Sequence, residues 1–169
     1  MNNLLKYFDE KELEFIKNDD IYTKADKIVQ RLFKDILDKG GNSYLNHLYH
    51  VSNCFEDINM KIIGLLHDVI EDTIITANDL IQIGFDNEIV DTVSIVSRND
   101  NESYNDYIDR ILKSNNDKAI NIKIVDMKHN MDLSRIENPT EKDIERIERK
   151  YKPQYKKIIN YIKKENEIW

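Results

Sequence analysis

Glycine and proline are scarce in this chain, which has four glycines and two prolines among 169 residues. The two residue types together usually make up about 12 per cent of a protein. Proline breaks helix interiors and glycine weakens them, so their scarcity favours long helical segments. Leu, Ile, Lys, Glu and Asp are abundant instead. We therefore predict an all-α fold, and we expect one domain because no repeat or linker divides the chain.

Other absences limit the classes of function. Cys54 is the only cysteine, so no disulfide can form within the chain, which suits a reducing cytosol. No apolar run approaches the ~18 residues of a transmembrane helix and no signal-like segment begins the chain, so we expect a cytoplasmic protein. The net charge of −7 argues against binding to nucleic acid or to an anionic membrane. Residues 146–164 carry eight Lys or Arg, for which we expect a solvated helix face.

Apolar residues recur at spacings of three and four along most of the chain, which predicts amphipathic helices. Thr76 and Thr140 are expected to be helix N-caps. A left-handed cap at Gly40-Gly41 is expected to follow the helix that begins at residue 21, and Pro153 should kink or restart the last helix. The expected helices cover 9–17, 21–37, 44–56, 60–72, 76–81, 86–97, 103–112, 117–134 and the segment from 140 onwards.

Four ionisable residues interrupt the apolar helix expected over 60–72, namely His67, Asp68, Glu71 and Asp72. At 3.6 residues per turn, their spacing would place them on one stripe of that helix. Ionised carboxylates leave water only when they are paired or bound to a metal, and a helix C-terminus disfavours negative charge. A nearby cation would remove both objections. A solvated polar face at a helix end is the alternative.

Two further ionisable residues stand in apolar segments. Asp126 belongs to "IKIVDMKHNM" and His47 to "YLNHLYHV". Together with His67 and Asp68 they form a mixed nitrogen and oxygen set, which suits Mn²⁺, Fe²⁺ or Zn²⁺ better than Ca²⁺ and lacks the thiolates of a structural zinc site. Four protein ligands leave coordination positions open for water and substrate. This pattern indicates a catalytic metal site.

A lone His, an adjacent His-Asp pair and a distant Asp, in this order, resemble the pattern of HD-domain metal-dependent phosphohydrolases. The longer segment "LLHDVIEDT" resembles the hydrolase domain of RelA/SpoT enzymes and their small stand-alone relatives, which remove pyrophosphate from the 3′ position of (p)ppGpp. "YLNH" and "VDMKHNM" resemble two further segments of that domain. Order and spacing agree over about residues 20–150, so the resemblance implies one HD-type domain over 1–169 with a C-terminal helix. Nothing resembles a synthetase domain.

The resemblance also implies roles for particular residues. Glu71 and Asp72 match the acidic pair that orients or deprotonates the attacking water, and Asn130 matches a residue near the substrate. Lys39 is a cation that can stabilise transition-state charge. A small nucleotide is the implied partner, and one divalent metal is the implied cofactor, with Mn²⁺ preferred and Fe²⁺ or Zn²⁺ as alternatives. The residues that match its ligands are His47, His67, Asp68 and Asp126.

Three positions depart from the RelA/SpoT pattern. Asp38 stands where those enzymes carry an Arg that stacks on guanine, Met127 replaces an Arg, and Asp132 replaces a basic residue. The first hypothesis is therefore a small hydrolase of (p)ppGpp or a related nucleotide pyrophosphate. A second is an HD phosphohydrolase that acts on another nucleotide, and a third is a metal or ligand sensor without turnover. We expect packing or surface roles for His50 and Arg98.

His129 inherits no ligand role from the resemblance. Its position three residues after Asp126 leaves open a contact with a metal ligand, beside a purely structural role. The oligomeric state is left open.

Overall fold

The computed structural model describes residues 3–167. Within that range all the regular elements are helices, and the only β-type pairing is one isolated bridge between Leu37 and Ser43. The predicted all-α fold is therefore confirmed. The elements in chain order are η1 (Leu4–Lys6), α1 (Glu10–Asn18), α2 (Ile21–Phe33), α3 (Leu45–Asn53), α4 (Ile58–Leu66), α5 (Val69–Asp72), α6 (Ala77–Gln82), α7 (Asn87–Val96), α8 (Tyr104–Lys113), α9 (Asp117–Met131), η2 (Leu133–Arg135), α10 (Glu141–Arg146), η3 (Ile147–Tyr151) and α11 (Lys152–Glu167).

Side-chain caps begin many of these helices. Thr76 and Thr140 each accept a hydrogen bond from the backbone three residues later and complete a reciprocal capping box, as their positions predicted. Gly84 follows α6 with a φ of +98°, a conformation that favours glycine. Local sequence therefore sets several of the helix boundaries.

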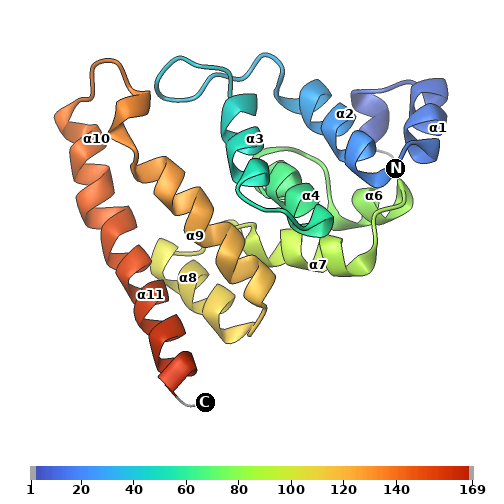
Figure 1. The fold of residues 1–169 in the computed structure, drawn as a ribbon. Coiled ribbons are helices and arrows are strands. Elements are labelled where there is room, and N and C mark those ends of the chain that lie inside the picture. The colour runs from blue at the N-terminus through green and yellow to red at the C-terminus, as the bar shows by residue number, and fades with distance from the viewer. Residues whose placement is uncertain (1–2, 168–169) are drawn as a thin grey trace.

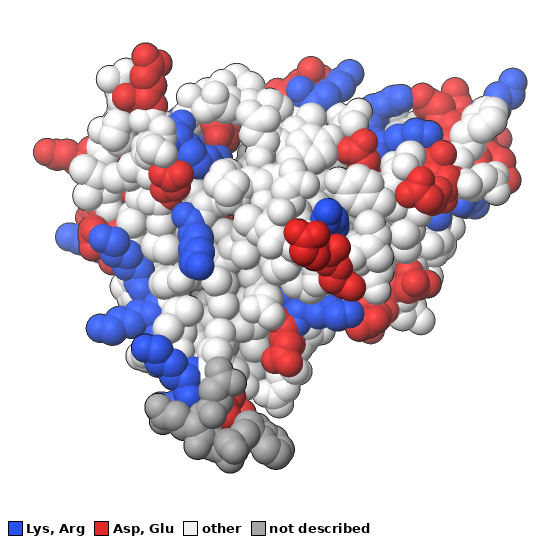
Figure 2. All heavy atoms as spheres, in the orientation of Figure 1, with Lys and Arg blue, Asp and Glu red and all other residues white. Residues whose placement is uncertain are grey.

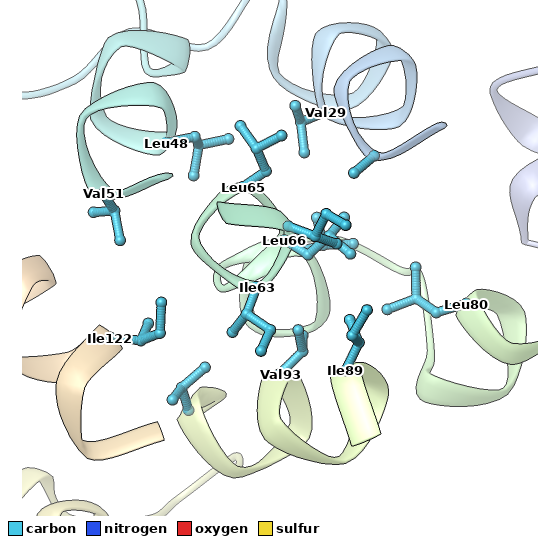
Figure 3. Close-up of a cluster of buried hydrophobic side chains, with 14 of the residues drawn as sticks. Val29, Leu48, Val51, Ile63, Leu65, Leu66, Leu80, Ile89, Val93 and Ile122 are labelled. Carbon is cyan, nitrogen blue, oxygen red and sulfur yellow. The ribbon is translucent and has the colours of Figure 1, made fainter. Parts of the chain in front are cut away.

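Helix α4 lies at the centre of the bundle, with α2, α3, α7 and α9 packed against it (Figure 1). Figure 3 shows side chains of these helices meeting those of α4 in the apolar core. Ile62, Ile63, Leu65 and Leu66 of α4 are all fully buried. A helix that is apolar on all sides belongs in a protein interior. This packing fixes the position of His67, the residue that follows α4.

Helices α3 and α4 approach closely at Gly64. A Cβ atom on Gly64 would lie 2.7 Å from Ser52 Cα and 2.8 Å from Ser52 N. Because backbone atoms cannot be displaced as side chains can, only glycine permits this approach. It brings His47 on α3 close to the end of α4.

The helix predicted over 21–37 is shorter than expected, because α2 ends at Phe33 and a loop follows. The Asp38 carboxylate accepts hydrogen bonds from the backbone N–H groups of Gly40 and Asn42, both at 2.9 Å. Bonds of this kind offer the backbone an alternative to the helix. They stabilise the loop instead.

The helix predicted over 60–72 is interrupted at His67 and Asp68, between α4 and α5. The expectation of one continuous polar stripe is therefore wrong. His67 Nδ1 lies 2.7 Å from the carbonyl oxygen of Gly64. This contact engages a carbonyl that would otherwise serve the helix ladder. The turn places Asp68 near His47 of α3 and His67 near Asp126 of α9.

The C-terminal segment continues from α10 through the π-helical turn η3 into α11. Pro153 is the second residue of α11 and has no N–H to donate, and the π turn directly precedes it. The predicted irregularity at Pro153 therefore takes the form of a local change in helix type. Arg146, which precedes the π turn, and Lys150, which lies within it, line the cleft described below.

Basic side chains gather along the edge of the molecule that α11 forms in Figure 2, in agreement with the solvated face expected there. Arg146, Lys150 and Lys157 differ, because they are partly buried. Among residues 3–167, no helix is both long enough and apolar enough to cross a membrane.

Candidate metal centre

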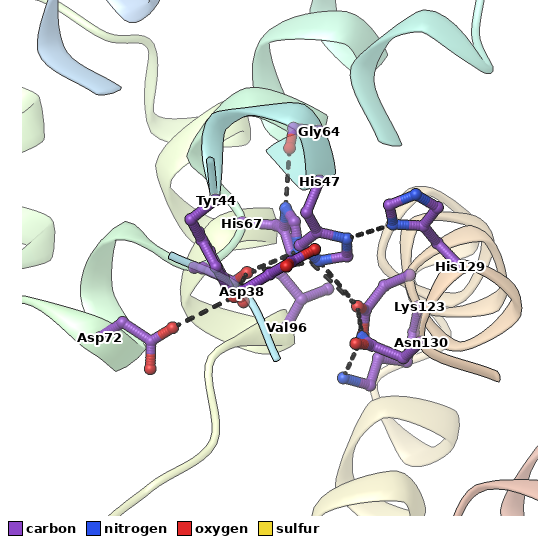
Figure 4. Close-up of polar contacts among 12 residues, drawn as sticks. Asp38, Tyr44, His47, Gly64, His67, Asp72, Val96, Lys123, His129 and Asn130 are labelled. Carbon is purple, nitrogen blue, oxygen red and sulfur yellow. Dashed lines mark hydrogen bonds and ion pairs between the residues drawn. The ribbon is translucent and has the colours of Figure 1, made fainter. Parts of the chain in front are cut away.

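Four side chains from three parts of the fold meet at one point (Figure 4). His47 comes from α3, His67 and Asp68 from the turn between α4 and α5, and Asp126 from α9. His47 Nε2 lies 3.6 Å from Asp68 Oδ2 and 3.2 Å from Asp126 Oδ1. His67 Nε2 lies 3.0 Å and 3.9 Å from the same two oxygens. The structure thus brings together all four residues that the sequence singled out as ligands.

His67 shows why this cluster suits a cation. A carbonyl oxygen only accepts hydrogen bonds, so the contact with Gly64 requires the proton on Nδ1 of His67. In the neutral imidazole, Nε2 then presents a lone pair toward the carboxylate of Asp68. The two atoms are 3.0 Å apart, but their geometry is not that of a hydrogen bond. The buried Nε2 therefore has no hydrogen-bond partner among the described residues. Either a proton or a metal ion would resolve the two facing acceptors.

The electrostatics of the protein alone favour the proton. Burial would lower the pKa of His67, but the charges of Asp68 and Asp126 more than offset it and raise the pKa to about 9. Burial also opposes the charge on Asp126, yet Lys123 and His47 hold its pKa well below the usual range. The site therefore keeps a buried carboxylate ionised, as a metal ligand requires.

Tyr44 and Lys123 hold the two carboxylates in place. The Tyr44 hydroxyl donates to Asp68 Oδ2 at 2.7 Å and lies 3.4 Å from Asp72 Oδ2. Lys123 donates to Asp126 Oδ2 at 2.7 Å, which leaves Oδ1 facing the histidines. We did not single out either residue from the sequence. Tyr44 begins the "YLNH" segment, and Lys123 is a lone charge in an apolar run, which was the available signal.

The two acids of α5 have different surroundings. Burial, followed by the charges of Asp68 and Glu71, raises the pKa of Asp72 to about 6. Glu71 accepts a hydrogen bond from the backbone N–H of Arg98 at 2.9 Å, and its other oxygen lies 3.7 Å from Nε of that arginine. Asp72 is therefore suited to exchange a proton near neutral pH, and Glu71 is fixed by its neighbour.

These groups line a cleft of about 380 Å³. Lys39 and Asn130, which we expected near a substrate, both line it, and Asn130 also donates to Asp126 Oδ1. Burial and the charge of Arg146 lower the pKa of Lys39, while burial and Arg98 lower that of Lys150. Cations that destabilise one another in this way form a surface suited to anions. The basic residues that line the cleft are Lys39, Arg98, Lys123, Arg135, Arg146 and Lys150.

The positions that depart from the RelA/SpoT pattern have structural roles. The Asp38 carboxylate, 8% exposed, pairs with Nη2 of Arg135 at 2.6 Å in addition to its loop contacts. Met127 is fully buried in the core, and Asp132 caps η2 through the N–H of Ser134 at 2.9 Å. Asp38 therefore positions an arginine at the cleft, although it carries no positive charge itself.

His129 contacts a predicted metal ligand directly, since its Nδ1 lies 2.6 Å from Nδ1 of His47. Burial and the charge of Arg135 lower the pKa of His129 to about 3. His50 stacks on His129 with ring centroids 3.9 Å apart, which agrees with the packing role expected for it. Arg98 has a larger role than the surface position expected, because it holds Glu71.

A solved structure has the same helical fold. No family model matches the sequence. The solved structure of a protein described as a metazoan ortholog of SpoT that hydrolyzes ppGpp and has a role in starvation responses superposes with a TM-score of 0.62. The alignment covers 87% of this chain and 96% of that chain at 18% identity. The chain therefore shares the all-helical fold of that ppGpp hydrolase, as the sequence resemblance predicted.

Proposed function

We propose that this protein is a metal-dependent phosphohydrolase of one HD-type domain that cleaves a nucleotide pyrophosphate, with 3′-pyrophosphate removal from (p)ppGpp as the leading reaction. The observation that carries the proposal is the buried, unpartnered Nε2 of His67, which faces two carboxylates at the base of a cation-lined cleft. The shared fold with a ppGpp hydrolase supports the same reaction class.

The donor set fits one divalent metal. Two imidazole nitrogens and two carboxylates, one of them held ionised by Lys123, suit Mn²⁺ first and Fe²⁺ or Zn²⁺ next. A divalent ion bound there would make water more acidic and polarise a phosphoryl oxygen. The residues proposed to hold it are His47, His67, Asp68 and Asp126.

Asp72 is the proposed general base. Its pKa of about 6 leaves the carboxylate mostly ionised at neutral pH. The same raised pKa makes it a better proton acceptor than an ordinary aspartate. The Tyr44 hydroxyl, which also bonds Asp68, aims this carboxylate toward the cluster. Glu71 orients the water from a position fixed by Arg98.

The basic residues of the cleft are proposed to bind the phosphate groups. Lys39, Arg98, Arg146 and Lys150 lie around a cavity whose base is acidic. A substrate that carries several phosphates fits both groups of residues. The cations bind its charged oxygens, while the acids direct a water molecule at one phosphorus atom. This distribution favours a nucleotide pyrophosphate over a simple phosphoester.

A different nucleotide is the second candidate. Asp38 forms an ion pair with Arg135 and accepts hydrogen bonds from two backbone N–H groups, so it cannot stack on a base as an arginine would. Recognition of the base therefore differs from the RelA/SpoT pattern. This difference favours another nucleotide or looser base selectivity.

The decisive experiment incubates Mn²⁺-loaded protein with a nucleotide panel that includes ppGpp, its adenine counterpart, nucleoside monophosphates and a cyclic dinucleotide. We expect pyrophosphate release from a substrate with a 3′-pyrophosphate. Asp126→Ala should abolish turnover, whereas Glu56→Gln, an exposed acid, should leave it unchanged. Phosphate release from a monophosphate alone would favour the second candidate. No turnover of any member would contradict the enzymatic proposal.

A further inference from the structure

The rings of His47 and His129 are nearly coplanar and meet edge to edge. Their planes differ by 10°, their centroids are 4.9 Å apart, and 2.6 Å separates the two Nδ1 atoms. At that distance the nitrogens share a hydrogen bond, and since neither can be a donor and an acceptor at once, one of them must carry the proton. Either His47 or His129 is therefore the donor, and the other ring is the acceptor.

The other nitrogen of His47 decides which ring donates. His47 Nε2 lies 3.2 Å from Asp126 Oδ1 and 3.6 Å from Asp68 Oδ2, so it is the nitrogen available to a metal. A ligating nitrogen must be unprotonated, and a neutral imidazole then carries its proton on Nδ1. His47 Nδ1 is therefore the donor, and His129 Nδ1 is the acceptor.

We infer that His129 is the positioning residue for His47: it accepts the Nδ1 proton of His47 and thereby fixes the tautomer and ring orientation in which Nε2 faces the metal. The inference rests on the proposed metal site and deepens it. Helix α9 then serves the centre twice, with Asp126 as a ligand and His129 as the support for a ligand from α3.

His67 has an equivalent support from the backbone. Its Nδ1 lies 2.7 Å from the Gly64 carbonyl oxygen, so its Nε2 faces the same carboxylates. On α3, the carbonyls near His47 belong to the helix ladder, and a side chain from another helix supplies the acceptor instead. Both predicted histidine ligands are thus held at Nδ1, one by a carbonyl and one by an imidazole.

Two neighbours hold His129 itself in place. The His50 ring stacks on it with centroids 3.9 Å apart and planes 14° apart. Its backbone carbonyl accepts from Nη1 of Arg135 at 2.9 Å, and Nη2 of the same arginine pairs with Asp38. The acceptor is therefore held by packing and hydrogen bonds, as a positioning group requires.

Two variants separate the acceptor from the ring. His129→Phe keeps a flat ring against His50 but removes the acceptor, whereas His129→Asn offers an amide oxygen close to the position of Nδ1 and loses the ring. Loss of an outer hydrogen-bond partner typically weakens metal affinity by about 10–100-fold. We expect a weakening of Mn²⁺ affinity of this size in the Phe variant and only a few-fold change in the Asn variant.

The measurement is the Mn²⁺ dissociation constant of the metal-free protein, from the electron paramagnetic resonance signal of free Mn²⁺. Circular dichroism checks that both variants are folded. Equal affinities in wild type and His129→Phe would overturn the inference, and so would equal weakening in both variants. Absence of Mn²⁺ binding by the wild type would contradict the proposed function as well, so the two failures are distinguishable.

A second readout detects the proton. In Co²⁺-loaded protein, the imidazole N–H protons of metal ligands give shifted, solvent-exchangeable proton resonances. We expect two such resonances in the wild type, from His47 and His67, and a shift of one in His129→Phe because the Nδ1 proton of His47 then has no acceptor. Two unchanged resonances in that variant would overturn the inference, since another group would then accept the His47 proton.

Discussion

The ammonium group of Lys123 lies 2.7 Å from Asp126 Oδ2, while Oδ1 of the same carboxylate faces His47 at 3.2 Å. Lys123 is 8% exposed, and its charge lies 4.7 Å from the centre of the Tyr107 ring. Burial alone would lower its pKa, but Asp126 and the tyrosines raise it well above the ordinary value. The centre therefore contains a permanent buried cation beside the position proposed for the metal.

Lys123→Met should destabilise the metal-free protein by ~3–5 kcal/mol, because it leaves Asp126 buried without its partner. Mn²⁺ should restore part of this loss, since the ion supplies the missing positive charge. Urea unfolding with and without Mn²⁺ measures both effects. Lys118→Met, on the same helix but in an exposed pair with Glu88, should change stability by no more than ~0.5 kcal/mol. Equal stability of the two variants would contradict a structural role for the buried pair.

The pH dependence should reveal the base. A base must be ionised to act, so kcat/KM should fall as the pH decreases through the pKa of Asp72, about 6 in the metal-free protein. The Tyr44 hydroxyl lowers that pKa by donating to the ionised form. Tyr44→Phe should therefore shift the acid limb to higher pH. A bound cation shifts the acid limb to lower pH in both proteins. The limb of Tyr44→Phe should therefore still lie at higher pH than that of the wild type.

Tyr49→Phe is the matched control for this shift. Tyr49 belongs to α3, and its hydroxyl donates to Asp26 of α2 at 2.6 Å, away from the centre. Its pH profile should coincide with that of the wild type. An unshifted limb in Tyr44→Phe would mean that Asp72 does not control the acid side of the profile.

The two acids of α5 should be needed for turnover and not for metal binding. Asp72→Asn and Glu71→Gln each keep shape and hydrogen bonding but remove the charge, and loss of a general base typically costs ~10²–10⁴-fold in rate. We expect kcat to fall in that range while metal content stays at the wild-type level, as measured by elemental analysis. Loss of metal from either variant would place that residue among the ligands instead.

The residues of the centre could be predicted from the sequence, but their arrangement could not. Ionisable groups in apolar segments drew attention to His47, His67, Asp68 and Asp126, because burial of charge is costly anywhere in a fold. The break at His67 was missed, since helical periodicity does not record the hydrogen bond from its ring to Gly64.

Two other features depend on contacts between distant parts of the chain. His129 supports His47 across 82 positions, and Asp38 pairs with Arg135 across 97. Patterns of three and four residues carry no information about such partners. The helices themselves were predictable from periodicity and caps, as α6 illustrates through Thr76 and Gly84.

The close approach of α3 and α4 provides the last prediction. In Gly64→Ala the new Cβ would lie 2.7 Å from Ser52 Cα, so the two helices must separate or tilt. α3 carries His47, and the Gly64 carbonyl holds His67, so the movement would displace two predicted ligands together. Overpacking of this kind typically costs ~1–3 kcal/mol. We expect a loss of stability in urea together with weaker Mn²⁺ binding.

Gly41→Ala separates the two effects. Gly41 has a φ of +80° with nothing within 4 Å of a new Cβ, so the substitution strains the backbone without a clash. It should cost ~1–2 kcal/mol, the penalty of a left-handed conformation, and leave Mn²⁺ affinity unchanged. If Gly64→Ala also retained wild-type affinity at a similar loss of stability, the spacing of α3 and α4 would not control the geometry of the centre. A selective loss of affinity in Gly64→Ala would show that helix packing sets the distance between His47 and His67.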